Sequence, residues 1–165
     1  MRSRTVQIAE IGVVAAAYAA LVYAFPISHM PLQMRVAETL KALVIWEPHL
    51  IPAFVIGNFL SNLWSPFVGP WDLGWMPFAN LIGAWVCWRL GRFNAYVGAT
   101  AYGLIIALAL ATMFHFIFHA PFQNFLVPLV PIEVGLIVLG VPVMWPVHRA
   151  LQRLIDGGTH AAETR

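Results

Sequence analysis

The sequence contains few charged residues. Asp, Glu, Lys and Arg make up 10% of its 165 residues, whereas hydrophobic residues make up 61%. Soluble domains carry about a quarter charged residues, and the mean hydropathy of this chain is +0.78. The composition therefore excludes an ordinary soluble domain and indicates a protein embedded in a lipid bilayer. The net charge of +2 does not indicate nucleic-acid binding.

Several catalytic signatures are also missing. The single lysine, Lys41, is not preceded by the glycines of a phosphate-binding loop, so the chain does not hydrolyse ATP by that route. The H-E-x-x-H and G-x-S-x-G motifs of metalloproteases and serine hydrolases are absent. There is no internal repeat of the kind from which many secondary transporters are built. We therefore expect a binding protein that is not an enzyme, needs no cofactor and takes its energy from a partner.

The chain is expected to form one domain over residues 1–165. Cys87 is the only cysteine, so no internal disulfide can form. The first apolar segment has no clean small-residue cleavage site, and a cleavable signal peptide is not expected. The C-terminal stretch DGGTHAAETR is expected to be frayed.

Long uncharged runs predict the membrane-crossing segments, because about 20 apolar residues cross the hydrocarbon core as a helix. We interpret APFQNFLVPLVP, residues 120–131, as a loop because it contains three prolines and two amides. The expected fold class is an all-α integral membrane bundle of six transmembrane helices with a short cytoplasmic tail at 153–165. The predicted helices cover residues 6–25, 32–46, 49–65, 72–90, 95–119 and 131–152. The second is short, so we expect it to be tilted or extended by the preceding PISHMP.

The basic residues predict the orientation. With six helices starting inside the cell, seven of the nine Lys and Arg residues fall on one face of the membrane. Positive charges favour the cytoplasmic side, so both termini are expected to be cytoplasmic, in a multi-pass protein of the cell membrane. The seven residues are Arg2, Arg4, Arg89, Arg92, Arg149, Arg153 and Arg165.

The two remaining basic residues lie in the stretch QMRVAETLKAL, which places Arg35, Glu38 and Lys41 in an apolar chain. Each charge at the centre of a membrane helix costs roughly 2.5–3.5 kcal/mol, so the three must pair, reach the interface or face a cavity. Both i,i+3 spacings allow pairing on a helix, and a purely structural polar ladder is one interpretation. A binding pocket is the other, because further polar residues are expected near the same membrane face. They are Asn58, Asn62, Asp72, Asn80 and Glu133.

The sequence resembles a known family at these residues. LQMRVAETLKAL, then PAFVIGNFLSNLWSP, then WDLG resemble the queuosine-precursor transporter family of the QueT type. Its members are the substrate-binding S components of energy-coupling factor (ECF) transporters. The resemblance spans residues 12–90, and the later helices match by pattern and by Glu133. It implies an ECF S-component fold that captures a 7-deazaguanine outside the cell and delivers it through a membrane coupling subunit and two ATPases.

The family motifs map onto individual residues of this chain. Arg35 and Glu38 match an Arg-x-x-Glu motif, Gly57 and Asn62 match a Gly-x-x-x-x-Asn stretch, and Asp72 and Glu133 match acids that open later helices. The chain departs from the family at Ala37, where Ser is frequent, at Lys41, where a small polar residue is usual, and in GWMPFAN.

A deazaguanine fits such a set of residues chemically. It presents two parallel donors, the ring N–H and the exocyclic amine, which one carboxylate can accept together. Glu38 is the first choice for this acceptor, with Arg35 orienting it or binding the ring carbonyl. Glu133 or Asp72 is placed to face the cationic aminomethyl group of a reduced precursor. Trp64, Trp71 and Trp75 are candidates to stack on the base or to form an interfacial belt.

Alanines in the first helix suggest a docking surface. Ala15 with Ala19, and Ala16 with Ala20, have the small-xxx-small spacing that lets a second helix approach closely in lipid. Packing within the bundle explains the same spacing. In the resembled family an alanine face of the first helix docks on the coupling subunit.

Other interpretations remain open. His115 and His119 have i,i+4 spacing but no clear third ligand, so a metal site is not expected. The chain could instead be an S component for another small vitamin-like solute, or a membrane protein whose polar cluster is structural. An intramembrane enzyme is disfavoured because no nucleophile and base pair is recognisable.

Overall fold

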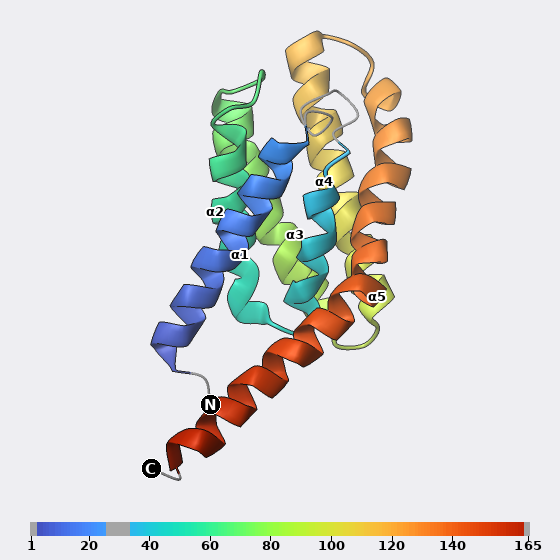
Figure 1. Cartoon of the computed structure of the whole chain (residues 1–165). Coiled ribbons are helices and arrows are strands. Elements are labelled where there is room, and N and C mark those ends of the chain that lie inside the picture. Colours follow the sequence, from blue (N-terminus) through green and yellow to red (C-terminus); the bar gives the residue numbers. More distant parts are fainter. Residues whose placement is uncertain (1–2, 26–33, 164–165) are drawn as a thin grey trace.

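The structure, a computed structural model, describes residues 3–25 and 34–163, with side chains up to residue 153. Within these ranges the chain forms six helical segments and no strand (Figure 1). They are α1 (Arg4–Ala24), η2 (Val36–Ile45), η3 (Pro48–Leu50) continuing into α2 (Ile51–Asn62), η4 (Trp71–Trp75) continuing into α3 (Met76–Gly91), α4 (Ala95–Phe118) and α5 (Phe122–Glu163). The predicted all-α class and the number of helices are confirmed. Some parts of the predictions lie outside the described residues. They are the PISHMP segment, residues 32–33 at the start of the second predicted helix, Arg2 and Arg165.

Three of these helices are long and apolar enough to cross a membrane, counting only the described part of the chain. They are α1, α4 and the residues Phe122–Arg153 of α5. The other α-helices are shorter: α3 has 16 residues and α2 has 12, about 18 Å for α2 at 1.5 Å per residue. The described structure therefore supports a membrane protein, with fewer long spans than the six predicted.

The predicted loop at residues 120–131 is wrong, because α5 already begins at Phe122. Helix α4 ends at His119, whose left-handed φ of 51° reverses the chain within three residues. Pro128, Pro131, Pro142 and Pro146 all lie inside α5. Membrane helices tolerate proline because packed neighbours and local adjustments satisfy the freed carbonyls. The predicted tail is also helical, since the backbone of α5 continues to Glu163.

Two of the shorter segments are not α-helical. η2 is a 3-10 helix of ten residues, although 3-10 runs longer than three or four residues are uncommon. It ends at Trp46 because Glu47 precedes Pro48, and the residue before a proline disfavours helical dihedrals. η4 is a π-helical turn of five residues at the start of α3. These two segments carry Glu38 and Asp72.

Glycines bring the helix backbones into close contact. A Cβ added at Gly57 in α2 would lie 3.0 Å from the carbonyl oxygen of Ala15 in α1, and one added at Gly103 in α4 would lie 2.5 Å from Cα of Val134 in α5. A Cβ at Gly140 in α5 would meet the carbonyl oxygen of Thr39, so α5 packs directly on the backbone of η2. Small residues are the usual means of close helix packing in lipid.

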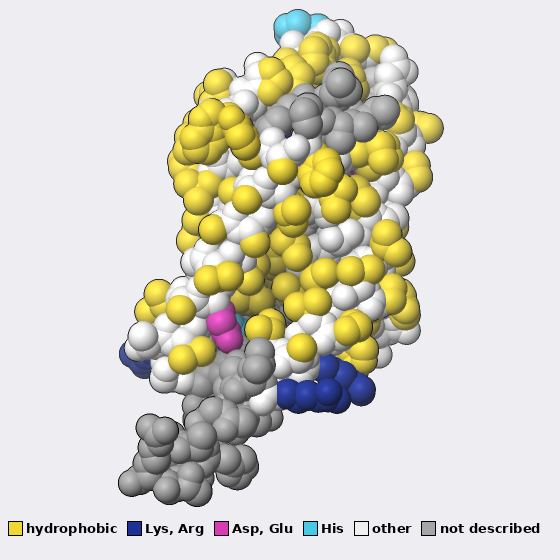
Figure 2. Space-filling view, viewed as in Figure 1, with side chains coloured by type: hydrophobic (Ala, Val, Ile, Leu, Met, Phe, Trp, Pro, Cys, Tyr) yellow, Lys and Arg dark blue, Asp and Glu magenta, His cyan; other side chains and the backbone are white. Residues whose placement is uncertain are grey.

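The start of α1 and the end of α5 lie at the same end of the molecule (Figure 1). Figure 2 shows Lys and Arg side chains mainly near this end of the visible face, below a surface that is largely hydrophobic. Large apolar side chains such as Ile8, Val13 and Val127 are exposed on the outside of the bundle. A hydrophobic outer surface with basic residues at one end is typical of a membrane protein.

Candidate functional site

The charged residues of the Arg35–Lys41 stretch form one row on η2. In a 3-10 helix three residues make one turn, so side chains at i and i+3 lie directly above one another. Arg35 caps η2, and Glu38 and Lys41 follow one and two turns later. None of the three side chains is more than 3% exposed. We call Arg35, Glu38 and Lys41 the binding row.

Both carboxylate oxygens of Glu38 are engaged. Oε1 accepts a 2.6 Å hydrogen bond from the hydroxyl of Tyr18 in α1, and Oε2 forms an ion pair with the ammonium of Lys41. The Lys41 ammonium also lies 5.0 Å from the ring centroid of Tyr102 and 5.7 Å from that of Tyr18. Cation–π contacts of this kind are strongest where water is excluded. The predicted i,i+3 pair of Glu38 and Lys41 is therefore present.

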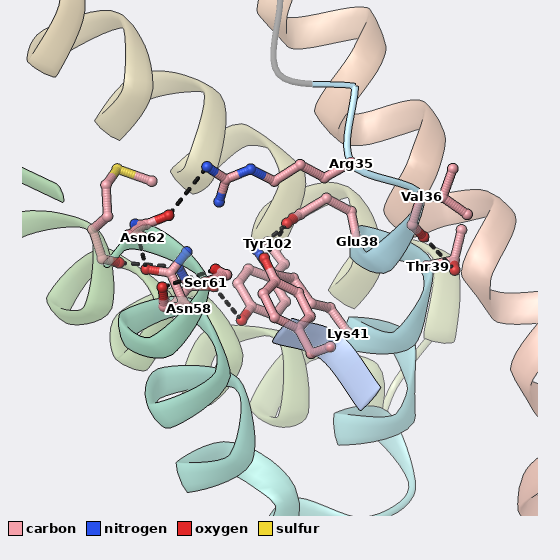
Figure 3. Close-up of polar contacts among 12 residues, drawn as sticks. Arg35, Val36, Glu38, Thr39, Lys41, Asn58, Ser61, Asn62 and Tyr102 are labelled. Atoms are coloured by element: carbon pink, nitrogen blue, oxygen red, sulfur yellow. Dashed lines mark hydrogen bonds and ion pairs between the residues drawn. The ribbon is translucent and has the colours of Figure 1, made fainter. Parts of the chain in front are cut away.

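Arg35 extends from η2 toward α2, where it meets the predicted asparagines (Figure 3). Its Nη2 donates a 3.1 Å hydrogen bond to Oδ1 of Asn62. The Asn62 amide donates to Oδ1 of Asn58 at 3.4 Å and to the backbone carbonyl of Asp72 at 3.0 Å. Asn62 thus connects η2 to the π-helical turn that carries Asp72.

Asn80 and Glu133 complete the cluster from α3 and α5. The hydroxyl of Tyr102 in α4 donates a 3.1 Å hydrogen bond to Oδ1 of Asn80, whose amide donates to the carbonyl of Met76. Glu133 is 1% exposed and interacts electrostatically with Glu38, Lys41 and Arg35. Its Oε2 is buried and has no hydrogen-bond partner. The Glu133 carboxyl also shares a side-chain hydrogen bond with Glu38.

The structure thus brings the predicted residues into one buried region reached from five elements. Arg35, Glu38, Asn58, Asn62, Asp72, Asn80 and Glu133 are all buried, as is Lys41. Glu38 and Glu133 lie there together with Arg35 and Lys41. Buried charges are costly unless they are paired or hydrogen-bonded.

Tyr18 and Tyr102 are parts of the cluster that the sequence analysis missed. Both rings are fully buried, and their hydroxyls reach Glu38 and Asn80. A tyrosine in a membrane helix is usually interpreted as an interfacial residue. The position of Tyr18 in the sequence could have indicated its burial, because it lies near the middle of the first apolar run and not at an end of it.

The three candidate tryptophans have other contacts. Trp71 stacks on Phe116 of α4, with ring centroids 5.1 Å apart and an interplanar angle of 11°. The indole of Trp75 donates a 3.0 Å hydrogen bond to the carbonyl of Ala109. Trp64 is 64% exposed and lies edge-on to Tyr23. These contacts place the tryptophans against aromatic and backbone groups of the neighbouring helices.

The four predicted docking alanines lie on different sides of α1. Ala15 is buried against α2 beside Gly57, and Ala19 is half-buried. Ala16 and Ala20 are exposed. A shallow apolar groove of about 310 Å³ runs beside them, lined by Ala19, Ala20, Tyr23 and Trp64. Ala16 and Ala20 are thus accessible to another helix, and Ala15 is not.

The ring of His115 does not point to a metal site. Its Nδ1 lies 2.7 Å from the carbonyl oxygen of Ala120, at the turn between α4 and α5. Among the described residues, no group of three or more His, Cys, Asp or Glu side chains is placed to hold a metal ion.

Comparison with known proteins gives one match. A family model described as QueT transporter matches residues 8–149, which include every residue of the buried cluster. No curated protein and no solved structure matches the chain.

Proposed function

Because the chain belongs to the QueT transporter family, we propose that it captures a queuosine precursor of the 7-deazaguanine type in the cluster of Arg35, Glu38 and Glu133. The protein acts as the S component of an ECF importer and is not an enzyme. The observation that carries the proposal is the buried, unpartnered Oε2 of Glu133 beside two buried cations.

The contacts within the cluster support a specific division of roles. Both oxygens of Glu38 already bind Tyr18 and Lys41, so Glu38 would have to give up a partner to accept a ligand. Glu133 is hydrogen-bonded to Glu38 but has one oxygen without a hydrogen-bond partner, and it takes the N–H donors of the deazaguanine or its aminomethyl cation. Arg35, whose Nη2 donates to Asn62, carries five N–H donors and in this proposal also binds the ring carbonyl. Asp72, Asn58 and Asn80 border the ligand.

The topology proposed for this function has six membrane segments and both termini in the cytoplasm. Two observations support it: the start of α1 and the end of α5 lie at one end of the molecule (Figure 1), and Arg4, Arg89, Arg92 and Arg149 are exposed. Positive charge favours the cytoplasmic side of the cell membrane. The end of η2 that carries Arg35 then lies toward the outside.

The energy for import comes from partners in this proposal. The sequence contains no phosphate-binding loop for ATP. The exposed Ala16 and Ala20 face of α1 docks on a membrane coupling subunit, which in turn binds two ATPases. Support comes from the exposure of these two alanines and of Gly12 on the same helix. Small side chains on a lipid-facing surface permit close approach of a partner helix.

The proposal is tested by calorimetry on the purified protein with a 7-deazaguanine bearing an aminomethyl group. Wild type should bind, and Glu133→Gln should weaken binding by roughly 2–5 kcal/mol because the ligand donors lose a charged partner. Folding should be kept, since the substitution removes a buried charge with an unpartnered oxygen. Unchanged affinity in Glu133→Gln would reject this role for Glu133.

The same experiment separates the alternatives. Mass spectrometry of ligand that co-purifies with the wild type would identify a different vitamin-like solute if that is the cargo. Failure to bind any deazaguanine, with no co-purifying solute, would favour a structural role for the cluster. The observation that favours a structural role is the ion pair of Glu38 and Lys41.

A further inference from the structure

A second group of polar side chains lies just beyond the other end of η2. Glu47 follows η2, and its Oε1 accepts a 2.7 Å hydrogen bond from the amide of Gln152 and lies 2.9 Å from Nδ1 of His148. Both partners belong to α5. The ring of His148 stacks on Trp46, with centroids 5.6 Å apart. We call Glu47, His148 and Gln152 the anchor, because they join the end of η2 to α5.

The anchor also reaches α1 through a histidine. Oε2 of Glu47 lies 3.4 Å from Nδ1 of His49, and Nε2 of His49 lies 2.5 Å from Oε2 of Glu10 in α1. The chain of contacts therefore connects α1, η3 and α5. None of these side chains belongs to the cluster proposed to bind substrate.

The length of η2 depends on both of its ends being held. A 3-10 helix rises about 2.0 Å per residue and an α-helix about 1.5 Å. Over the nine steps from Val36 to Ile45, the 3-10 form is longer by about 4–5 Å. Arg35 is bonded to Asn62 at one end, and Glu47 is bonded to α5 at the other. Relaxation to an α-helix would require one of these attachments to give way.

The helix type also determines how the binding row lines up. Arg35 and Lys41 are six residues apart, which is two full turns of a 3-10 helix. In an α-helix, at about 100° per residue, the same two side chains would point about 120° apart. Lys41 would then leave the rings of Tyr18 and Tyr102.

We propose that Glu47 is a positioning residue that keeps η2 stretched, so that Arg35, Glu38 and Lys41 stay aligned for substrate. The role in binding rests on the function proposed above, whereas the role in holding η2 does not. Loss of the anchor frees the end of η2, disperses the binding row and lowers substrate affinity. Glu47, His148 and Gln152 are not among the residues proposed to touch the ligand.

The test uses amide hydrogen exchange of the full-length protein in lipid nanodiscs, without ligand. Glu47→Ala should make the amides of η2 exchange about tenfold faster, the size expected for losing hydrogen bonds to a charged group. The amides of α4 should be unaffected. Arg89→Ala is the control, since Arg89 is also an exposed arginine on a membrane helix and contacts the rings of Trp85 and Trp88. It should leave η2 unchanged.

A second readout is affinity for the aminomethyl deazaguanine, which should fall about tenfold in Glu47→Ala, with Glu47→Gln in between because its amide oxygen still accepts hydrogen bonds. Unchanged exchange in η2, or equal acceleration in all helices, would overturn the proposal. If Glu47→Ala does not fold, Gln152→Ala gives the same comparison with one hydrogen bond removed. If the wild type binds no deazaguanine but η2 still loosens in Glu47→Ala, the anchor stands and the proposed function fails.

Discussion

The hydroxyl of Tyr18 donates a 2.6 Å hydrogen bond to Oε1 of Glu38, twenty residues further along the chain. The Tyr18 ring also packs edge-on against Phe54, and its side chain lies against Gly57 of α2. One ring therefore joins α1, α2 and η2. The helix proposed to dock on a partner is thereby in direct contact with the residues proposed to bind substrate.

Removal of this hydroxyl should destabilise the protein. Tyr18→Phe leaves Oε1 of Glu38 buried without its donor, and we expect a loss of about 1–3 kcal/mol in the free energy of unfolding. Tyr23→Phe is the control, because Tyr23 is exposed on the same helix, and it should have little effect. Chemical denaturation in detergent measures both. Equal stability of the two variants would contradict the importance of this hydrogen bond.

The ion pair of Glu38 and Lys41 should show strong coupling. Glu38→Gln leaves a buried ammonium without its carboxylate, which costs about 3–5 kcal/mol when one partner of a buried pair is removed. Lys41→Met leaves the carboxylate unpaired. The double variant Glu38→Gln/Lys41→Met should be more stable than either single variant, because neither charge remains. Denaturation of the four proteins forms a double-mutant cycle, and strictly additive effects would show that the two side chains do not interact.

Two glycines near the contact between α4 and α5 should respond in opposite directions to alanine. A Cβ at Gly103 would lie 2.5 Å from Cα of Val134, so Gly103→Ala pushes two backbones apart and should cost about 1–3 kcal/mol. Gly135 is exposed on α5 and a Cβ there meets nothing within 4 Å. Gly135→Ala should stabilise the helix by about 0.5–1 kcal/mol. Thermal unfolding distinguishes the two, and destabilisation by both would contradict the packing described.

Leucines on the exposed face of α1 should interfere with assembly. The double variant Ala16→Leu/Ala20→Leu enlarges two exposed side chains, so the isolated protein should fold and bind substrate normally. Co-purification of the coupling subunit and cellular uptake should both fall sharply. Ala15→Leu is the comparison, since Ala15 is buried, and it should reduce stability itself by about 1–3 kcal/mol. Loss of folding in the double variant would show that these alanines pack internally.

The sequence was sufficient to predict which polar residues are buried together. Arg35, Glu38 and Asn62 are conspicuous because the segments around them are almost entirely apolar. The hydrophobic runs also predicted six helical segments, although their ends shifted. Both inferences rest on the cost of placing polar groups in hydrocarbon, which depends on composition and position alone.

Contacts between distant segments could not be predicted in this way. The sequence does not show that Tyr18 reaches Glu38, or that the Lys41 ammonium lies between two tyrosine rings. The 3-10 form of η2 accompanies contacts with distant segments, the hydrogen bonds at its two ends and the close approach of Gly140, which local propensity does not capture. The prolines at 128 and 131 suggested a loop because their effect was judged from local rules, whereas packed neighbours allow α5 to pass through them.

Because α5 is long, a small bend within it displaces its C-terminal end by several ångströms. Its 42 residues correspond to about 63 Å along the helix axis at 1.5 Å per residue, and the axis changes direction in the C-terminal half (Figure 1). Pro142 and Pro146 each remove a backbone hydrogen bond from this helix, so it bends most easily there. A bend of about 10° at Pro142 would displace Glu163 by about 5 Å, given the helical rise. The contacts of Glu47 with His148 and Gln152 lie just beyond Pro146, so they restrain α5 where such a bend would begin.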